Sequence, residues 1–108
     1  MKINVKRNPY YQAQKSLSGF LYLLTFRWNV DVNVSPLTDY NTGKWYMDLL
    51  GLNNDIDIKG KCLLPGKELL AKHGYRELGT MWVFDNSDRD ENPNFDDFGT
   101  RWTLEYYE

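Results

Sequence analysis

Apolar and polar side chains alternate with a period of two in several short stretches, most clearly over residues 20–29. One face of this stretch carries Phe20, Tyr22, Leu24, Phe26 and Trp28. The other face carries Leu21, Leu23, Thr25, Arg27 and Asn29. Alternation of this kind, built from aromatic and branched residues, predicts a β-strand with one face in a core.

The same alternation predicts further strands over residues 44–50, 55–64, 80–84 and 99–107. The expected core-facing residues are Trp45, Met47 and Leu49 in the first of these, and Trp102, Leu104 and Tyr106 in the last. Gly60 predicts a bulge or bend within its strand. Asn41-Thr42-Gly43 is typical of a hairpin turn, so the strands on either side of it are expected to pair antiparallel.

The rest of the chain is predicted to be turns, one loop and one helix. Lys15-Ser16-Leu17-Ser18-Gly19 indicates the end of a strand and a tight turn, and residues 31–44 read as a loop, with a short strand at Val32–Val34 as one option. Lys67–His73 is the one plausible helix, about two turns long, with Gly74 at its end.

We therefore predict a mainly β protein: a small antiparallel β-sandwich or partly open barrel of five to six strands with one short helix. Residues 15–108 are expected to form a single β domain. Residues 1–14, in which Pro9 interrupts any regular element, are expected to form an extended N-terminal arm.

Composition narrows the function classes. The net charge of −2 argues against a dedicated nucleic-acid binder, which would carry a strong basic excess. The single cysteine, Cys62, cannot form an internal disulfide. No apolar run is long enough for a transmembrane helix, and the N-terminus lacks the apolar core of a signal peptide, so we expect no membrane partner and synthesis in a cytoplasm.

Charge and aromatic residues suggest partner contacts at two places. The candidates in the N-terminal arm are Lys2, Lys6, Arg7, Tyr10 and Tyr11. The candidates in a later acidic segment are Asp88, Asp90 and Glu91. Opposite charges in separate segments help copies of one protein meet head to tail, although a solvated loop is the usual fate of an acidic run.

Catalytic and metal chemistry find little support. The acidic run lacks the glycine and the closing glutamate of a calcium loop. Asp96 and Asp97 are neighbours in an extended segment and would point apart, so we interpret them, with Gly99, as a structural turn before the last strand. His73 has no nucleophile motif near it. We predict that the chain is not an enzyme, with no catalytic residues, cofactor or metal.

One alternative is an OB-like protein that binds single-stranded nucleic acid. Arg27, Trp28, Lys44, Trp45 and Tyr46 combine rings and positive charge on neighbouring strands, as such proteins require. The net charge is acidic, and the same rings are needed in the core. We therefore rank nucleic-acid binding below a role in protein–protein interaction.

An ordered set of short segments carries a resemblance to a known family. The segments are Phe26-Arg27-Trp28-Asn29, Trp45-Tyr46-Met47-Asp48-Leu49, Ile58-Lys59-Gly60, Leu64-Pro65-Gly66-Lys67-Glu68-Leu69-Leu70, Leu78-Gly79-Thr80-Met81-Trp82-Val83-Phe84-Asp85 and Asp96-Asp97-Phe98-Gly99-Thr100. In their order and spacing, the chain resembles the baseplate plug family of contractile-tailed bacteriophages over about Ser16 to Tyr107. It departs from that pattern in its basic, aromatic N-terminal arm and in the longer linker from Asp31 to Gly43.

The resemblance implies a structural protein of the virion, located in the tail baseplate hub near the distal end of the tail tube and the spike. Such a protein acts through contacts with other baseplate, hub, spike and tail-tube proteins. Several symmetry-related copies are expected. The resemblance brings no catalytic residues with it.

Overall fold

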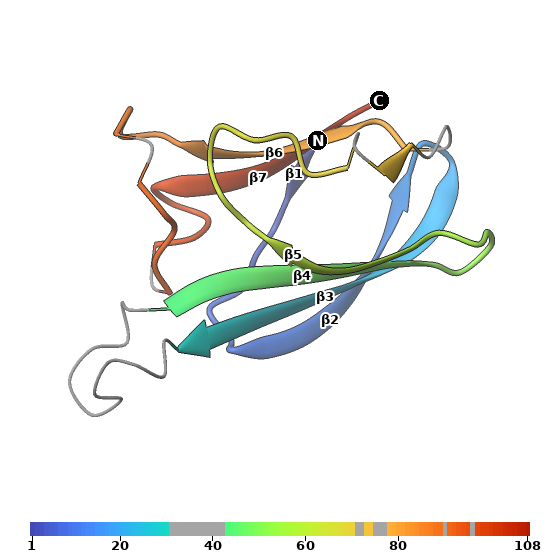
Figure 1. The fold of residues 1–108 in the computed structure, drawn as a ribbon, viewed down its shortest axis with the longest axis horizontal. Helices are drawn as coiled ribbons and strands as arrows, with labels where there is room; N and C mark the ends of the chain where they lie inside the picture. Colours follow the sequence, from blue (N-terminus) through green and yellow to red (C-terminus); the bar gives the residue numbers. More distant parts are fainter. Residues whose placement is uncertain (31–42, 71–72, 75–77, 90, 96) are drawn as a thin grey trace.

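The computed structural model describes residues 1–30, 43–70, 73–74, 78–89, 91–95 and 97–108. Its seven strands in these ranges are β1 (Lys2–Ile3), β2 (Tyr10–Leu17), β3 (Phe20–Val30), β4 (Gly43–Gly51), β5 (Asp57–Cys62), β6 (Thr80–Asp85) and β7 (Trp102–Tyr107). They form a four-stranded sheet in the order β2-β3-β4-β5 and a three-stranded sheet in the order β1-β7-β6, with antiparallel neighbours throughout. Figure 1 shows the two sheets as two layers. The prediction of a small antiparallel β-sandwich is confirmed, with seven strands where five to six were expected, and the sheets do not close into a barrel.

Period-two alternation assigns the inner faces as predicted. Trp45, Met47 and Leu49 of β4 are buried together with the even-numbered residues Tyr22 to Trp28 of β3. From the other sheet come Met81 and Val83 of β6 with Trp102, Leu104 and Tyr106 of β7. All of these side chains belong to one hydrophobic cluster, so a single core holds the two sheets together.

Two local predictions agree with the backbone. Ser18 and Gly19 both have positive φ, 52° and 83°, as a two-residue turn between antiparallel strands requires. Gly60 has a φ of 67°, and the register of β4 and β5 shifts between Met47 and Leu49. The Asp48 carboxylate accepts a hydrogen bond from the Gly60 N–H at 2.7 Å, which fixes this bulge.

The N-terminal residues lie in the sheets, whereas the sequence predicted an extended arm over residues 1–14. Lys2 and Ile3 form β1 against β7, and Tyr10 begins β2, which pairs with β3 along its whole length. Ile3 and Val5 are only 4% and 3% exposed and belong to the core. The alternation of Ile3 and Val5 with polar residues therefore marks core-facing positions, as it does in the longer strands.

The helix predicted over Lys67–His73 is not found at residues 67–70, and Ala71 and Lys72 lie outside the described residues. This segment instead covers the free edge of β6. Leu69 N–H donates to the Met81 carbonyl at 3.0 Å, and the Glu68 carboxylate accepts from Met81 N–H at 2.8 Å. A two-turn helix has little stability of its own, so burial of Leu69 and Leu70 beside β6 prevails.

Some predictions fall outside the described residues. They are the loop over residues 31–42 with its optional strand at Val32–Val34, the turn residues Asn41 and Thr42, and the acidic residues Asp90 and Asp96.

Candidate protein-interaction surfaces

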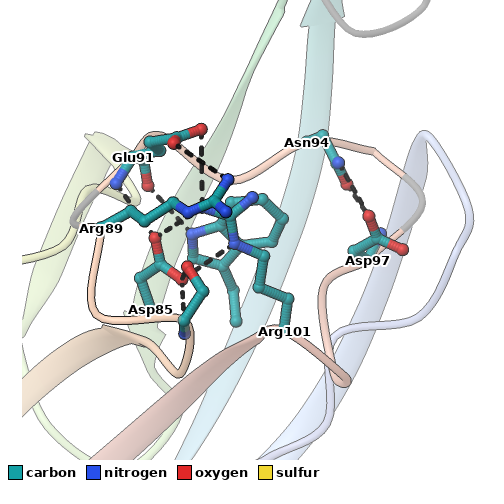
Figure 2. A network of polar contacts seen from close by, with 8 residues as sticks. Asp85, Arg89, Glu91, Asn94, Asp97 and Arg101 are labelled. Atoms are coloured by element: carbon teal, nitrogen blue, oxygen red, sulfur yellow. Dashed lines mark hydrogen bonds and ion pairs between the residues drawn. The ribbon is translucent and has the colours of Figure 1, made fainter.

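The acidic segment after β6 is organised by one buried carboxylate, that of Asp85. Arg101 binds it in a fork, with Nε and Nη2 each 2.9 Å from one of its oxygens. The Asp85 carboxylate also accepts hydrogen bonds from the N–H and hydroxyl of Ser87 and from Glu91 N–H. Figure 2 shows Arg101 and Glu91 beside Asp85. The carboxylate thus holds Ser87 and Glu91 beside the end of β6.

Indole groups then fix the following residues across the end of the core. Trp102 donates its N–H to the Glu91 carbonyl at 2.9 Å, and Trp45 donates to the Asn94 carbonyl at 3.0 Å. The Phe95 ring stacks on Trp45 with 5.6 Å between centroids. Because Trp102 belongs to one sheet and Trp45 to the other, residues 91–95 bridge the two sheets. The described part of the acidic segment is therefore held in place by specific hydrogen bonds and ring contacts.

The charges around Asp85 make its protonation costly. Its hydrogen bonds with Arg101 lower the pKa of Asp85 well below its usual range, and those from Ser87 and Glu91 act in the same direction, against the opposing effect of desolvation. Since the native pKa is depressed, the stabilisation is fully present above the ordinary aspartate pKa of about 3.9. It is lost as the pH falls below that value towards the native pKa.

We therefore expect Asp85→Asn to lower the urea midpoint at neutral pH and to flatten its decline between about pH 4 and about pH 2. Unfolding curves at several pH values measure both effects. The matched control is Asp57→Asn, whose exposed carboxylate lies 3.7 Å from Lys59 and should contribute little. Equal pH profiles for the two variants would contradict the role assigned to Asp85.

The acidic candidates for partner contact are placed unequally. Asp88 is exposed, at a backbone φ of 61°. Glu91 is exposed too, but its carboxylate lies 3.5 Å from Arg101 and 3.9 Å from Arg89. Asp88 is therefore the better placed of the two to meet a partner.

The N-terminal candidates also separate into two kinds. Lys2, Lys6, Arg7 and Tyr10 are exposed, with Tyr10 at 58%. Tyr11 instead stacks its ring on Phe26, 5.1 Å between centroids, and its hydroxyl bonds to the backbone of Asn4 and Lys6. Burial raises the pKa of Tyr11 to about 12. Tyr11 therefore ties the connection before β2 to the four-stranded sheet.

The turn before β7 uses backbone groups more than carboxylates. The Asp97 carbonyl accepts hydrogen bonds from the N–H groups of Thr100 and Arg101 at 3.1 and 3.0 Å, and Gly99 has a φ of 102°. The Asp97 carboxylate accepts from the Asn94 amide at 2.9 Å. A residue with a β-carbon at position 99 would be strained, so this glycine is required by the turn.

Sequence reasoning missed an apolar area on the outer face of the four-stranded sheet, which we call the leucine patch: Leu21, Leu23, Leu50 and Leu52. Leu23 and Leu50 are direct cross-strand neighbours, and Leu52 N–H donates to the Leu21 carbonyl at 3.0 Å. Leu21, Leu50 and Leu52 are 38%, 41% and 43% exposed. The available signal was that residues 20–24 are apolar on both faces of their strand.

A second apolar area, the aromatic patch, lies on the outer face of the three-stranded sheet and consists of Trp82, Phe84 and Tyr107. Trp82 and Phe84 occupy successive positions on one face of β6. Tyr107 of β7 pairs with Thr80 of β6, on the same face. Phe84 and Tyr107 are 38% and 45% exposed. Large exposed side chains on both outer faces are typical of a protein that other proteins cover.

The structure gives less support to a nucleic-acid surface, a metal site or a membrane-spanning helix than to protein–protein contacts. Trp28 and Trp45 are buried and cannot stack on bases, and Arg27 pairs with Asp48 at 3.1 Å. Within the described residues, no three side chains of His, Cys, Asp or Glu are grouped to hold a metal ion. Nor does the described part of the chain contain a helix with the length and apolar character to cross a bilayer.

Comparison with known proteins agrees with the resemblance seen in the sequence. The family model described as cyanophage baseplate Pam3 plug gp18 matches residues 1–108. A search of curated proteins found no match. Because the family model covers the whole chain, this protein belongs to the cyanophage baseplate plug family, whose place is the tail baseplate of the virion.

Proposed function

We propose that this protein is a plug-like structural subunit of the baseplate hub, near the distal end of the tail tube and the spike, and that it acts through protein–protein contacts. Its family membership supports a structural role with baseplate and tail proteins as partners. The observation that carries the mode of action is the pair of apolar patches on opposite outer faces of the sandwich. Neighbouring subunits would remove this apolar surface from water.

Several symmetry-related copies would suit such a surface. The leucine patch and the aromatic patch lie on different sheets, so one copy can present each patch to a different neighbour. Contacts between unlike patches close into rings when the rotation between subunits permits it. The exposed charges of Lys6 and Asp88 lie outside both patches and would set orientation more than affinity.

We expect Leu50→Lys to leave the protein folded while reducing its incorporation into particles. Leu50 is 41% exposed on the outer face, so a lysine there can reach water in the free protein but not in a covered contact. Mass spectrometry of purified particles, made with variant protein replacing the wild type, measures the incorporated amount. Denaturation of the free variant checks its stability.

The matched control is Asn29→Lys, which adds the same side chain to an exposed position of β3 in the same sheet. It should be incorporated like the wild type. Normal incorporation of Leu50→Lys would remove the leucine patch from the proposal, and absence of the wild-type chain from particles would overturn the proposed function itself.

A further inference from the structure

The long free sheet edge at β2 differs from the other three edges. The edge of β6 is covered by the segment containing Glu68 and Leu69, and β5 carries the bulge at Gly60. β1 is only 2 residues long, whereas β2 spans 8. Coverage, bulges and short strands prevent pairing at an edge, and β2 has none of these three. Its one protective feature is the inward-facing charge of Lys15, which disfavours a strand without acidic side chains.

The hydrogen-bond ladder shows which backbone groups face outward along β2. Leu17 and Phe20 flank the two-residue turn and are paired, and Trp28 N–H donates to the Pro9 carbonyl at 2.8 Å. Odd-numbered residues of β2 therefore bond to β3, and even-numbered residues direct their N–H and C=O groups away from it. Among the described residues, none outside β3 is hydrogen-bonded to the backbone of Gln12, Gln14 or Ser16.

Charge distinguishes the possible occupants of this edge. Residues 1–30 contain five Lys and Arg side chains and no Asp or Glu. Lys15 is the only charged residue of β2 and lies opposite Tyr22, on the side of the strand that faces the other sheet. A second copy docked through its own β2 would bring like charges together, which is unfavourable across paired strands. A strand that carries carboxylates would instead be attracted.

We propose that the open edge of β2 accepts an extended acidic segment of a neighbouring protein as a fifth strand of the four-stranded sheet. Backbone bonds to Gln12, Gln14 and Ser16 supply the pairing, and Lys15, in a part of the chain without Asp or Glu over residues 1–30, selects for acidic side chains. The identity of the neighbour as a baseplate protein rests on the proposed function, but the pairing chemistry does not.

Two short synthetic peptides test this directly, one alternating valine with glutamate and one alternating valine with lysine. Each is added to the purified full chain, and backbone amide exchange is followed by NMR. The glutamate peptide should slow exchange at Gln12, Gln14 and Ser16, whereas the lysine peptide should not. Lys15→Glu should weaken binding of the glutamate peptide and strengthen binding of the lysine peptide.

Two variants at position 14 distinguish backbone hydrogen bonding to the peptide from non-specific electrostatic attraction. Gln14→Pro removes an outward N–H without removing a bond to β3, so it should abolish protection by the peptide while the signals of β7 stay unchanged. Gln14→Ala keeps the N–H and should bind as the wild type does.

Three results would overturn the inference: no protection by the glutamate peptide, equal protection by both peptides, or protection without peptide that grows with protein concentration. The last result would identify a second copy as the occupant. Because the assay uses the isolated chain, its failure leaves particle incorporation untouched, and loss of incorporation leaves peptide binding untouched.

Discussion

Trp45→Ala is expected to lower the free energy of unfolding by about 3–5 kcal/mol, the usual cost of truncating a buried tryptophan. Trp45 is 1% exposed, and its ring contacts Trp28, Phe95 and Phe98. Its N–H also holds the Asn94 carbonyl, so the substitution removes one of the bonds between the four-stranded sheet and the segment after β6. A domain of this size has about 5–15 kcal/mol in all, so the variant should be close to unfolding.

Urea denaturation followed by far-ultraviolet circular dichroism measures this loss. Trp82→Ala is the matched control, because it makes the same chemical change on the outer face of β6, where the ring is partly exposed. Its effect on stability should be much smaller. Similar losses for the two variants would show that the cluster around Trp45 does not hold the sheets together.

Alternation predicted the central strands and their buried faces because it follows directly from β-geometry. The large apolar residues of β3, β4 and β7 recur at every second position over enough residues to assign one face of each strand to the core. The turn at Ser18-Gly19 and the bulge at Gly60 were predictable because each contains a glycine, which accepts positive φ at little cost.

The elements that escaped prediction depend on contacts between distant residues. β2 is polar at half of its positions, and the part before residue 15, where no strand was predicted, becomes one by pairing with β3. The segment with Glu68, Leu69 and Leu70 has helix-forming residues, but the free edge of β6 offers it hydrogen bonds that no local rule includes. Tertiary contacts override local preference in both cases.

The Asp85 site shows where sequence reasoning could have gone further. Met81, Val83 and Asp85 occupy alternate positions of one strand, so Asp85 follows two core residues on the inward face. A carboxylate in that position needs a partner, and Arg101 lies just before β7, the neighbour of β6. In the sequence, Asp85 stands at the start of a run of acidic residues, so it was grouped with them and not recognised as a buried residue.

The N-terminal residues provide the second large effect. Changing Ile3 and Val5 together to alanine should cost roughly 4 kcal/mol or more, from about five buried carbons at about 0.8 kcal/mol each plus the cavity they leave. Both side chains are in the core, and β1 is fixed to β7 by the pair of hydrogen bonds between Met1 and Tyr106, at 2.8 and 2.9 Å. Urea denaturation measures the loss.

The alternation of the same segment supplies the control. Lys2 and Asn4 are exposed, so changing both to alanine should leave stability almost unchanged. If residues 1–14 were an arm separate from the domain, both double variants would unfold like the wild type. If they are part of the sandwich, only the Ile3 and Val5 variant loses stability. Deleting the whole segment would then confuse folding with docking, so a role of this region in assembly must be tested at exposed positions such as Lys6 and Arg7, which leave the core intact.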